Sequence, residues 1–259
     1  MSAVDLHATI DGPSDAPPLV LGPSLGTTTA MWEPQMEALS QHFRVIRYDA
    51  RGHGASPVPP GPYTIDDFAD DLLKLLDRLG IETAHIAGIS LGGMTAMAFA
   101  AAHPERVDRL VLACTSAHLA APEAWADRAA KVRAGGTSAI ADAVVARWVT
   151  PTYAAAHPDV IARLHQLLVD SPDDGYVASC GAIERMDVRE RLPGIAAQTL
   201  VIAGAQDLAI PPVHAERIAA GIADARLAVL DPGAHLANIE QPEAFANLLI
   251  EHLQDGNLP

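Results

Sequence analysis

Short apolar runs recur along the 259-residue chain and alternate with longer amphipathic stretches. Runs this short, without polar residues at every second position, are typical of strands buried on both faces of a parallel sheet. They comprise residues 19–21, 44–48, 84–89, 109–113, 199–203 and 226–230. An earlier segment, residues 4–10, alternates well enough to predict an antiparallel edge strand.

Helical periodicity fills the intervals between these runs. In residues 65–79, apolar side chains such as Phe68, Leu72 and Leu76 recur on one face with acidic residues opposite, and Gly80 is a typical helix terminator. Further helices are predicted over residues 91–103 and 242–253. Strands that alternate with helices predict an α/β fold with a mostly parallel, doubly wound sheet.

The alternation stops after the fourth parallel strand. From about residue 118 to residue 191 the sequence has helical patterns divided by Pro and Gly but no convincing strand. We therefore predict a core formed by residues 1–117 and 192–259, with residues 118–191 inserted as a helical cap. Such a cap would cover the carboxyl edge of the sheet, where ligands bind in open α/β folds.

Charge and composition exclude several classes of partner. Lys and Arg number 17 against 32 Asp and Glu, and the net charge of -15 would repel nucleic acids and anionic membranes. No signal-peptide pattern or membrane-length apolar run is present, which predicts a cytoplasmic protein with a small-molecule partner. The two cysteines, Cys114 and Cys180, are predicted to be buried thiols without catalytic roles.

The pentapeptide Gly88-Ile89-Ser90-Leu91-Gly92 lies where a predicted strand meets a predicted helix. A serine at such a turn is held in a strained conformation with its hydroxyl exposed, and the flanking glycines let strand and helix approach closely. The pattern alone occurs by chance in roughly one chain in ten of this length. Its position between strand and helix predicts a nucleophile elbow at Ser90.

A serine nucleophile needs a base and an acid that orients the base. Asp207 follows the predicted strand 199–203, and His235 follows the strand 226–230, in the order Ser, Asp, His that this architecture requires. We predict Ser90, Asp207 and His235 as a catalytic triad. Asp207 as a simple helix N-cap is the alternative, and Asp231 is a poorer acid because it precedes the turn that carries His235.

A tetrahedral intermediate needs two backbone N–H donors. We assign them to Leu91, after the nucleophile, and to Leu25 in the early loop 22–27, where an ordinary turn is the alternative; Pro23 has no N–H to donate. The glycine-rich segment 49–56 lacks the lysine and the spacing of a phosphate-binding loop. It is interpreted as a structural turn in which His53 has no catalytic role.

Several segments resemble the 3-oxoadipate enol-lactonases of the α/β-hydrolase superfamily. They are residues 24–28 with Met31 and Trp32, residues 47–54 and 61–65, and in the cap residues 139–144, Arg147 with Trp148, and Gly175 with Tyr176; residues 235–240 complete the set. One departure is Pro23, where the family often has Asn.

The resemblance implies a serine hydrolase that opens a small carboxylate-bearing lactone, 3-oxoadipate enol-lactone, to 3-oxoadipate through an acyl-enzyme during aromatic catabolism, without metal or cofactor. An anionic substrate needs a local cation, for which we predict Arg133, with Trp125 and Trp148 as pocket walls. The alternative for these three is a solvated arginine and ordinary core tryptophans.

Proteins with other functions can have the same nucleophile elbow. A broad carboxylesterase and a cofactor-free perhydrolase of the haloperoxidase type are the rival enzymes, and a non-catalytic ligand sensor is the rival of another class. The serine at position 90 excludes, as close functional models, enzymes that have an aspartate there, such as dehalogenases and epoxide hydrolases.

Overall fold

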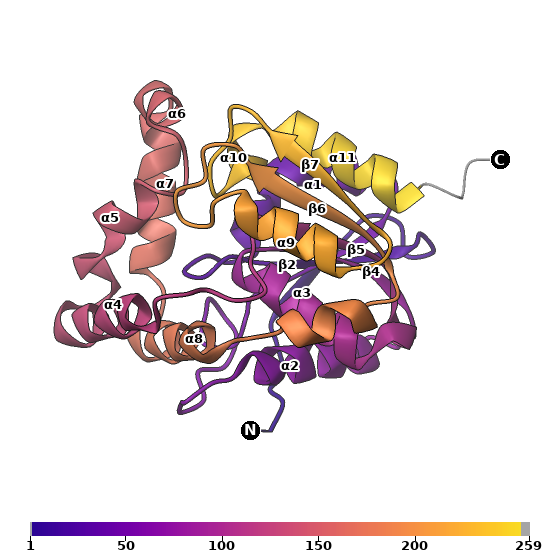
Figure 1. Ribbon diagram of the computed structural model, residues 1–259, viewed down its shortest axis with the longest axis horizontal. Helices are drawn as coiled ribbons and strands as arrows, with labels where there is room; N and C mark the ends of the chain where they lie inside the picture. The colour runs from indigo at the N-terminus through magenta and orange to yellow at the C-terminus, as the bar shows by residue number, and fades with distance from the viewer. Residues whose placement is uncertain (1, 255–259) are drawn as a thin grey trace.

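A twisted seven-stranded sheet forms the centre of the computed structural model, which describes residues 2–254 (Figure 1). The strand order is β1-β3-β2-β4-β5-β6-β7, and all neighbouring pairs except β1 with β3 are parallel. The strands are β1 (Ala8–Asp11), β2 (Pro18–Gly22), β3 (Arg44–Tyr48), β4 (Ala84–Ile89), β5 (Val107–Ala113), β6 (Gln198–Gly204) and β7 (Ala225–Leu230). The predicted α/β class with a mostly parallel sheet is confirmed.

Helices cover both faces of the sheet and gather beyond one of its ends. α1 and α11 pack together over one face, and α2, α3 and α9 lie over the other (Figure 1). The helices are α1 (Glu33–Leu39), α2 (Ile65–Arg78), α3 (Leu91–Ala102), α4 (Pro122–Gly135), α5 (Ala141–Val145), α6 (Pro151–Ala156), α7 (Pro158–Val169), α8 (Asp173–Arg185), α9 (Val213–Gly221), α10 (Ala237–Glu240) and α11 (Pro242–Gln254). No helix in residues 2–254 is both long enough and apolar enough to cross a membrane.

The edge strand is shorter than the sequence predicts. β1 begins at Ala8 instead of residue 4, because most of the preceding backbone groups bond to side chains and not to β3. The exception is the His7 carbonyl, which accepts from the N–H of Asp49, just after β3. The Val4 N–H donates to Asp71 on α2, the His7 N–H donates to Ser56, and the Leu6 carbonyl accepts from Arg78. Alternation of residue types cannot distinguish these partners from a strand ladder.

The segment predicted as a cap contains α4 to α8 and lies between β5 and β6. The arrowheads of β6 and β7 point toward these helices (Figure 1). At the base of the segment, the two connections meet in an isolated bridge between His118 and Asp187, and the Val188 N–H donates to Ala117 at 2.9 Å. The carboxyl edge of the sheet therefore faces a layer of helices.

A fully buried arginine anchors the turn that follows β3. Arg51 donates to both carboxylate oxygens of Asp71, at 2.6 and 2.7 Å, and its guanidinium lies 5.3 Å from the ring centre of Tyr63. Because both charges are buried, each depends on the other for the solvation that water would provide. This ion pair holds the predicted structural turn, residues 49–56, against α2.

Replacing only one member of this pair leaves a buried charge without its partner. We expect Arg51→Met to lower the free energy of unfolding by about 3–5 kcal/mol, measured by urea denaturation. The double variant Arg51→Met/Asp71→Leu removes both charges and should be closer to wild type than Arg51→Met. Equal stability of the single variant and wild type would contradict this role.

His252 on α11 is also buried, with Nε2 3.2 Å from the carbonyl oxygen of Leu110. Burial lowers the pKa of His252 to about 4. The native state therefore binds fewer protons than the unfolded state between about pH 6.5 and pH 4, so stability falls as pH falls through this window. His252→Gln, which keeps an N–H donor but does not titrate, should reduce that loss by about 1–3 kcal/mol in urea titrations at pH 7 and pH 4.5.

Candidate active site

Ser90 occupies the sharp turn between β4 and α3 with φ of 54° and ψ of -114°. A left-handed φ is strained for a residue with a side chain, and here the surrounding backbone enforces it. A Cβ at Gly88 would overlap the backbone of Gly92, and a Cβ at Gly92 would overlap the backbone of Gly22. The two glycines of the pentapeptide are therefore required by close backbone packing around the serine.

His235 and Asp207 meet at the same edge of the sheet. The Nδ1 atom of His235 lies 2.8 Å from Oδ2 of Asp207, and both side chains are buried. His235 lies on the loop after β7 and Asp207 on the loop after β6, so neighbouring parallel strands bring them together. Ser90 and His235 also line one common pocket.

The second carboxylate oxygen of Asp207 has its own partners. Oδ1 accepts hydrogen bonds from the N–H groups of Ala209 at 2.7 Å and Ile210 at 2.8 Å. These amides belong to the turn before α9, which begins only at Val213, so Asp207 does not cap that helix. Its bonds fix the carboxylate with Oδ2 toward His235. Asp231 is exposed just after β7. Among the described residues it forms no hydrogen bond to His235.

The loop carrying His235 is tied to the helical segment 118–191 by Glu240, a residue without a predicted role. Glu240 accepts hydrogen bonds from the N–H and hydroxyl groups of Thr150, at 2.8 and 2.7 Å, and from the N–H of Ala234. The Leu236 N–H donates to the carbonyl of Trp148 at 2.7 Å. The backbone on both sides of His235 is thus held against the segment that precedes α6.

The early loop that contains Leu25 is fixed by backbone contacts. The Gly92 N–H donates to the carbonyl of Pro23 at 2.9 Å, and the Gly26 N–H donates to Nε2 of His53 at 3.1 Å. Because the Pro23 contact uses a carbonyl, proline satisfies it as well as a residue with an N–H. Burial lowers the pKa of His53, which keeps Nε2 an acceptor, with Nδ1 3.1 Å from the Arg51 carbonyl.

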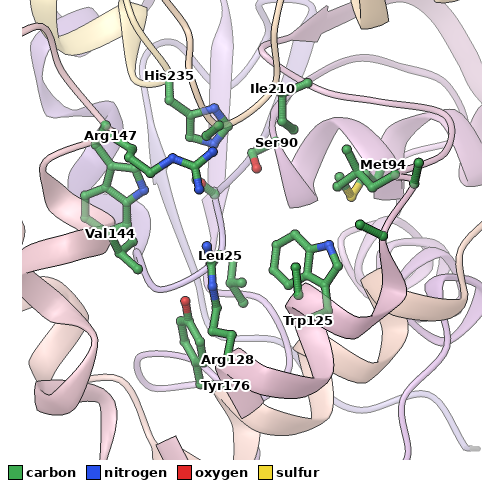
Figure 2. Close-up of a pocket in the computed structure, with 17 residues that line it drawn as sticks. Leu25, Ser90, Met94, Trp125, Arg128, Val144, Arg147, Tyr176, Ile210 and His235 are labelled. Atoms are coloured by element: carbon green, nitrogen blue, oxygen red, sulfur yellow. The ribbon is translucent and has the colours of Figure 1, made fainter. Parts of the chain in front are cut away.

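A cavity of about 220 Å³ opens above Ser90 (Figure 2). This is smaller than the roughly 300–1,000 Å³ of drug-sized sites and suits a small substrate. The cavity is lined by five residues that the sequence predicted for the site: Leu25, Ser90, Trp125, Trp148 and His235. The remaining lining residues are Ser24, Met94, Leu119, Ala120, Ala121, Ala124, Arg128, Val144, Arg147, Tyr176, Ala209 and Ile210.

Arg133 does not reach this cavity, and the prediction that it lies there is wrong. It lines a separate pocket beside the proline-rich segment 58–62. The reason is helical phase: Ala124, Trp125 and Arg128 share the cavity-facing side of α4, whereas Arg133 lies five residues beyond Arg128 and about 140° around the helix axis.

Two other arginines line the cavity, and neither was predicted. The guanidinium of Arg128 lies between Leu25 and Tyr176, with its carbon 4.6 Å from the ring centre of Trp125 (Figure 2). Arg147 reaches toward His235 from the other side and donates to the carbonyl of Leu208 (Figure 2). The signal for Arg128 was its position three residues after Trp125, on the same helical face.

Two buried hydroxyls at the cavity form no hydrogen bond of normal geometry to other atoms of residues 2–254. They are Oγ of Ser24 and the phenol oxygen of Tyr176, whose side chains are almost fully buried. Burial raises the pKa of Tyr176, although nearby Arg128 favours the charged form, so the phenol retains its proton. A buried hydroxyl without a partner is costly, so both groups are available to a polar ligand.

No group of three or more possible metal ligands occurs among the described side chains. Cys114 and Cys180 are buried free thiols, as predicted. Burial raises the pKa of Cys180 to about 12 and also raises that of Cys114. Neither thiol is therefore an activated nucleophile at neutral pH.

Comparison with known proteins places the chain in a family. The α/β-hydrolase-fold family model matches residues 17–242. The chain belongs to the α/β-hydrolase family and is a hydrolase. Within that family it groups with the 3-oxoadipate enol-lactonases.

Individual relatives cover nearly the whole chain. 3-Oxoadipate enol-lactonase 2 of Acinetobacter baylyi is 38% identical over 93% of this chain and 90% of its own length. The crystal structure of the enol-lactonase from Burkholderia xenovorans LB400 is 45% identical, with a TM-score of 0.94 over 96% of both chains. The putative carbamate hydrolase RutD of Stutzerimonas stutzeri is 32% identical over 97% of this chain and 96% of its own.

Proposed function

We propose that Ser90, His235 and Asp207 form a catalytic triad that hydrolyses a carboxylic ester bond through an acyl-enzyme. The observation that carries this proposal is the convergence of a strained elbow serine and a carboxylate-oriented histidine on one small cavity. A protein that only binds a ligand does not require this combination of features. Their joint presence favours catalysis over binding alone.

The substrate we propose is 3-oxoadipate enol-lactone, and the product is 3-oxoadipate. The names of the enol-lactonase relatives support it, as do the small volume of the cavity and its flat Trp125 and Trp148 walls. Arg128 binds the substrate carboxylate in place of the predicted Arg133. It is half-buried, which strengthens its attraction for an anion in a chain whose net charge is -15.

The reaction begins when Oγ of Ser90 attacks the lactone carbonyl while Nε2 of His235 takes its proton. The carbonyl π electrons move to oxygen, and the N–H groups of Leu25 and Leu91 stabilise the oxyanion. Collapse breaks the ring C–O bond and expels an enolate, which takes the proton from His235 to give an enol that tautomerises to the ketone. Water then attacks the acyl-enzyme with His235 as base, releasing 3-oxoadipate and restoring Ser90.

We propose that this activity serves the breakdown of aromatic acids. A neutral-ester carboxylesterase, a perhydrolase and a carbamate hydrolase share the same triad chemistry. Arg128 and the buried hydroxyls of Ser24 and Tyr176 favour a substrate with an anionic end and further polar oxygens. A neutral acyl chain would leave these groups without partners.

Asp207→Asn should keep the turn but disable the base. Its Oδ1 can still accept from Ala209 and Ile210, which places the amide NH₂ group against Nδ1 of His235. That contact favours the tautomer with the proton on Nε2, which cannot accept a proton from Ser90. We expect kcat to fall about 10⁴-fold with an unchanged melting temperature, measured by loss of lactone absorbance. A loss below tenfold would contradict the role of Asp207.

Arg128→Met should weaken turnover of the carboxylate-bearing lactone specifically. We expect kcat/KM for 3-oxoadipate enol-lactone to fall about 10–150-fold, the equivalent of a lost charged hydrogen bond, and that for its neutral methyl ester to change less than threefold. Arg133→Met is the matched control on the same helix and should leave both values unchanged. Ser90→Ala defines the uncatalysed rate.

The same assay separates the alternatives. Equal losses on acid and methyl ester would overturn carboxylate binding by Arg128, and a selective loss in Arg147→Met alone would move that role to Arg147. Wild-type preference for neutral nitrophenyl esters, or turnover of carbamate with no turnover of the lactone, would overturn the substrate proposal. Absence of Ser90-dependent labelling by a fluorophosphonate would overturn the triad.

A further inference from the structure

We propose that Thr27 and Thr115 are positioning residues that aim the two oxyanion N–H groups. Each threonine donates to the carbonyl of a peptide unit whose other end carries one of these N–H groups. The proposal rests on the serine-hydrolase part of the proposed function and does not depend on which ester or lactone is the substrate.

The first anchor lies in the early loop. The hydroxyl of Thr27 lies 2.7 Å from the carbonyl oxygen of Ser24 and 3.0 Å from Sδ of Met31, and it donates to the carbonyl because a thioether sulfur is the weaker acceptor. The Thr27 N–H approaches the same carbonyl oxygen at 3.2 Å. The peptide joining Ser24 to Leu25 is planar and trans, so its N–H points away from its carbonyl. Fixing the Ser24 carbonyl toward Thr27 therefore fixes the Leu25 N–H in the opposite direction.

The second anchor lies at the elbow and repeats this geometry. The hydroxyl of Thr115, just beyond β5, donates to the carbonyl of Ser90 at 2.7 Å, and the Met94 N–H donates to it at 2.9 Å. The peptide joining Ser90 to Leu91 is thereby oriented with its N–H away from Thr115. Without this anchor, a strained φ at Ser90 would favour rotation of the peptide.

Burial makes both anchors rigid, because each threonine side chain is at most 2% exposed. No water competes for the hydroxyl, and a Cβ at Gly93 would overlap Thr115, so this threonine fits closely against α3. Within residues 2–254, neither the Leu25 N–H nor the Leu91 N–H donates to another protein atom. Both N–H groups therefore have no acceptor among the described residues, which leaves them free to stabilise an anion.

Replacement of either threonine by valine keeps the shape and removes the donor. For Thr27→Val and Thr115→Val we expect kcat to fall about tenfold, less than the roughly 10²–10³-fold cost of deleting an oxyanion donor, with KM changed less than twofold. Thr27→Ser and Thr115→Ser keep the hydroxyl and should restore kcat to within threefold of wild type. Thr199→Val is the matched control, because Thr199 is also buried and donates to a backbone carbonyl, that of Ala197, away from the cavity.

A binding measurement separates positioning from a merely structural role. Phenylboronic acid forms a tetrahedral adduct with a reactive serine, whereas the product 3-oxoadipate binds without one. Each valine variant should bind the boronate about tenfold more weakly and 3-oxoadipate equally well. Equal weakening of both ligands, or a loss of kcat in Thr199→Val of the same size, would overturn the proposal.

Two further outcomes keep this test separate from the substrate assignment. If the enol-lactone is not turned over but p-nitrophenyl acetate is, with dependence on Ser90, the same kcat and boronate comparisons are made with that ester and decide the proposal. If a valine variant unfolds, the alanine variant replaces it, and boronate binding equal to wild type in a folded variant without the hydroxyl would overturn the role of that threonine.

Discussion

The hydrogen bond from the Gly92 N–H to the Pro23 carbonyl joins the turn that carries Ser90 to the loop that carries Leu25. It connects the elbow after β4 to the loop after β2, and these neighbouring strands already share a parallel register. The close approach of the two backbones depends on Gly92, where a Cβ would lie 2.3 Å from the carbonyl oxygen of Gly22. The position of Ser90 relative to Leu25 depends on this contact between backbones.

The sequence was sufficient to predict residues whose positions follow from strand order. Ser90, Asp207 and His235 each come directly after a strand, and parallel strands end at one edge, so their convergence required only the topology. Arg128 was missed for the opposite reason. Its position depends on which face α4 turns to the sheet, and the weak amphipathicity of that helix does not indicate this face. Only the spacing of three residues from Trp125 distinguishes Arg128 from Arg133.

The same limit applies to contacts made by side chains with distant backbone. The start of β1 could not be predicted because Asp71, Ser56 and Arg78 compete for the backbone of residues 4–7. Glu240 was likewise invisible as a link between two loops, since its partner Thr150 is 90 residues away in the chain. Hydrophobic periodicity reports which face is buried, and it carries no information about such individual polar partners.

The bonds of Glu240 have a consequence for how this cap evolves and how it can be redesigned. The Glu240 carboxylate accepts hydrogen bonds from Thr150, before α6, and from the Ala234 N–H, beside His235. Trp148 lines the cavity, and its carbonyl accepts from the Leu236 N–H. The helical segment 118–191 thus supports the backbone beside His235 and also lines the cavity. A chimaera that grafts a foreign cap onto this core must bring an equivalent of Thr150 with it, or exchange of specificity will also disturb the histidine.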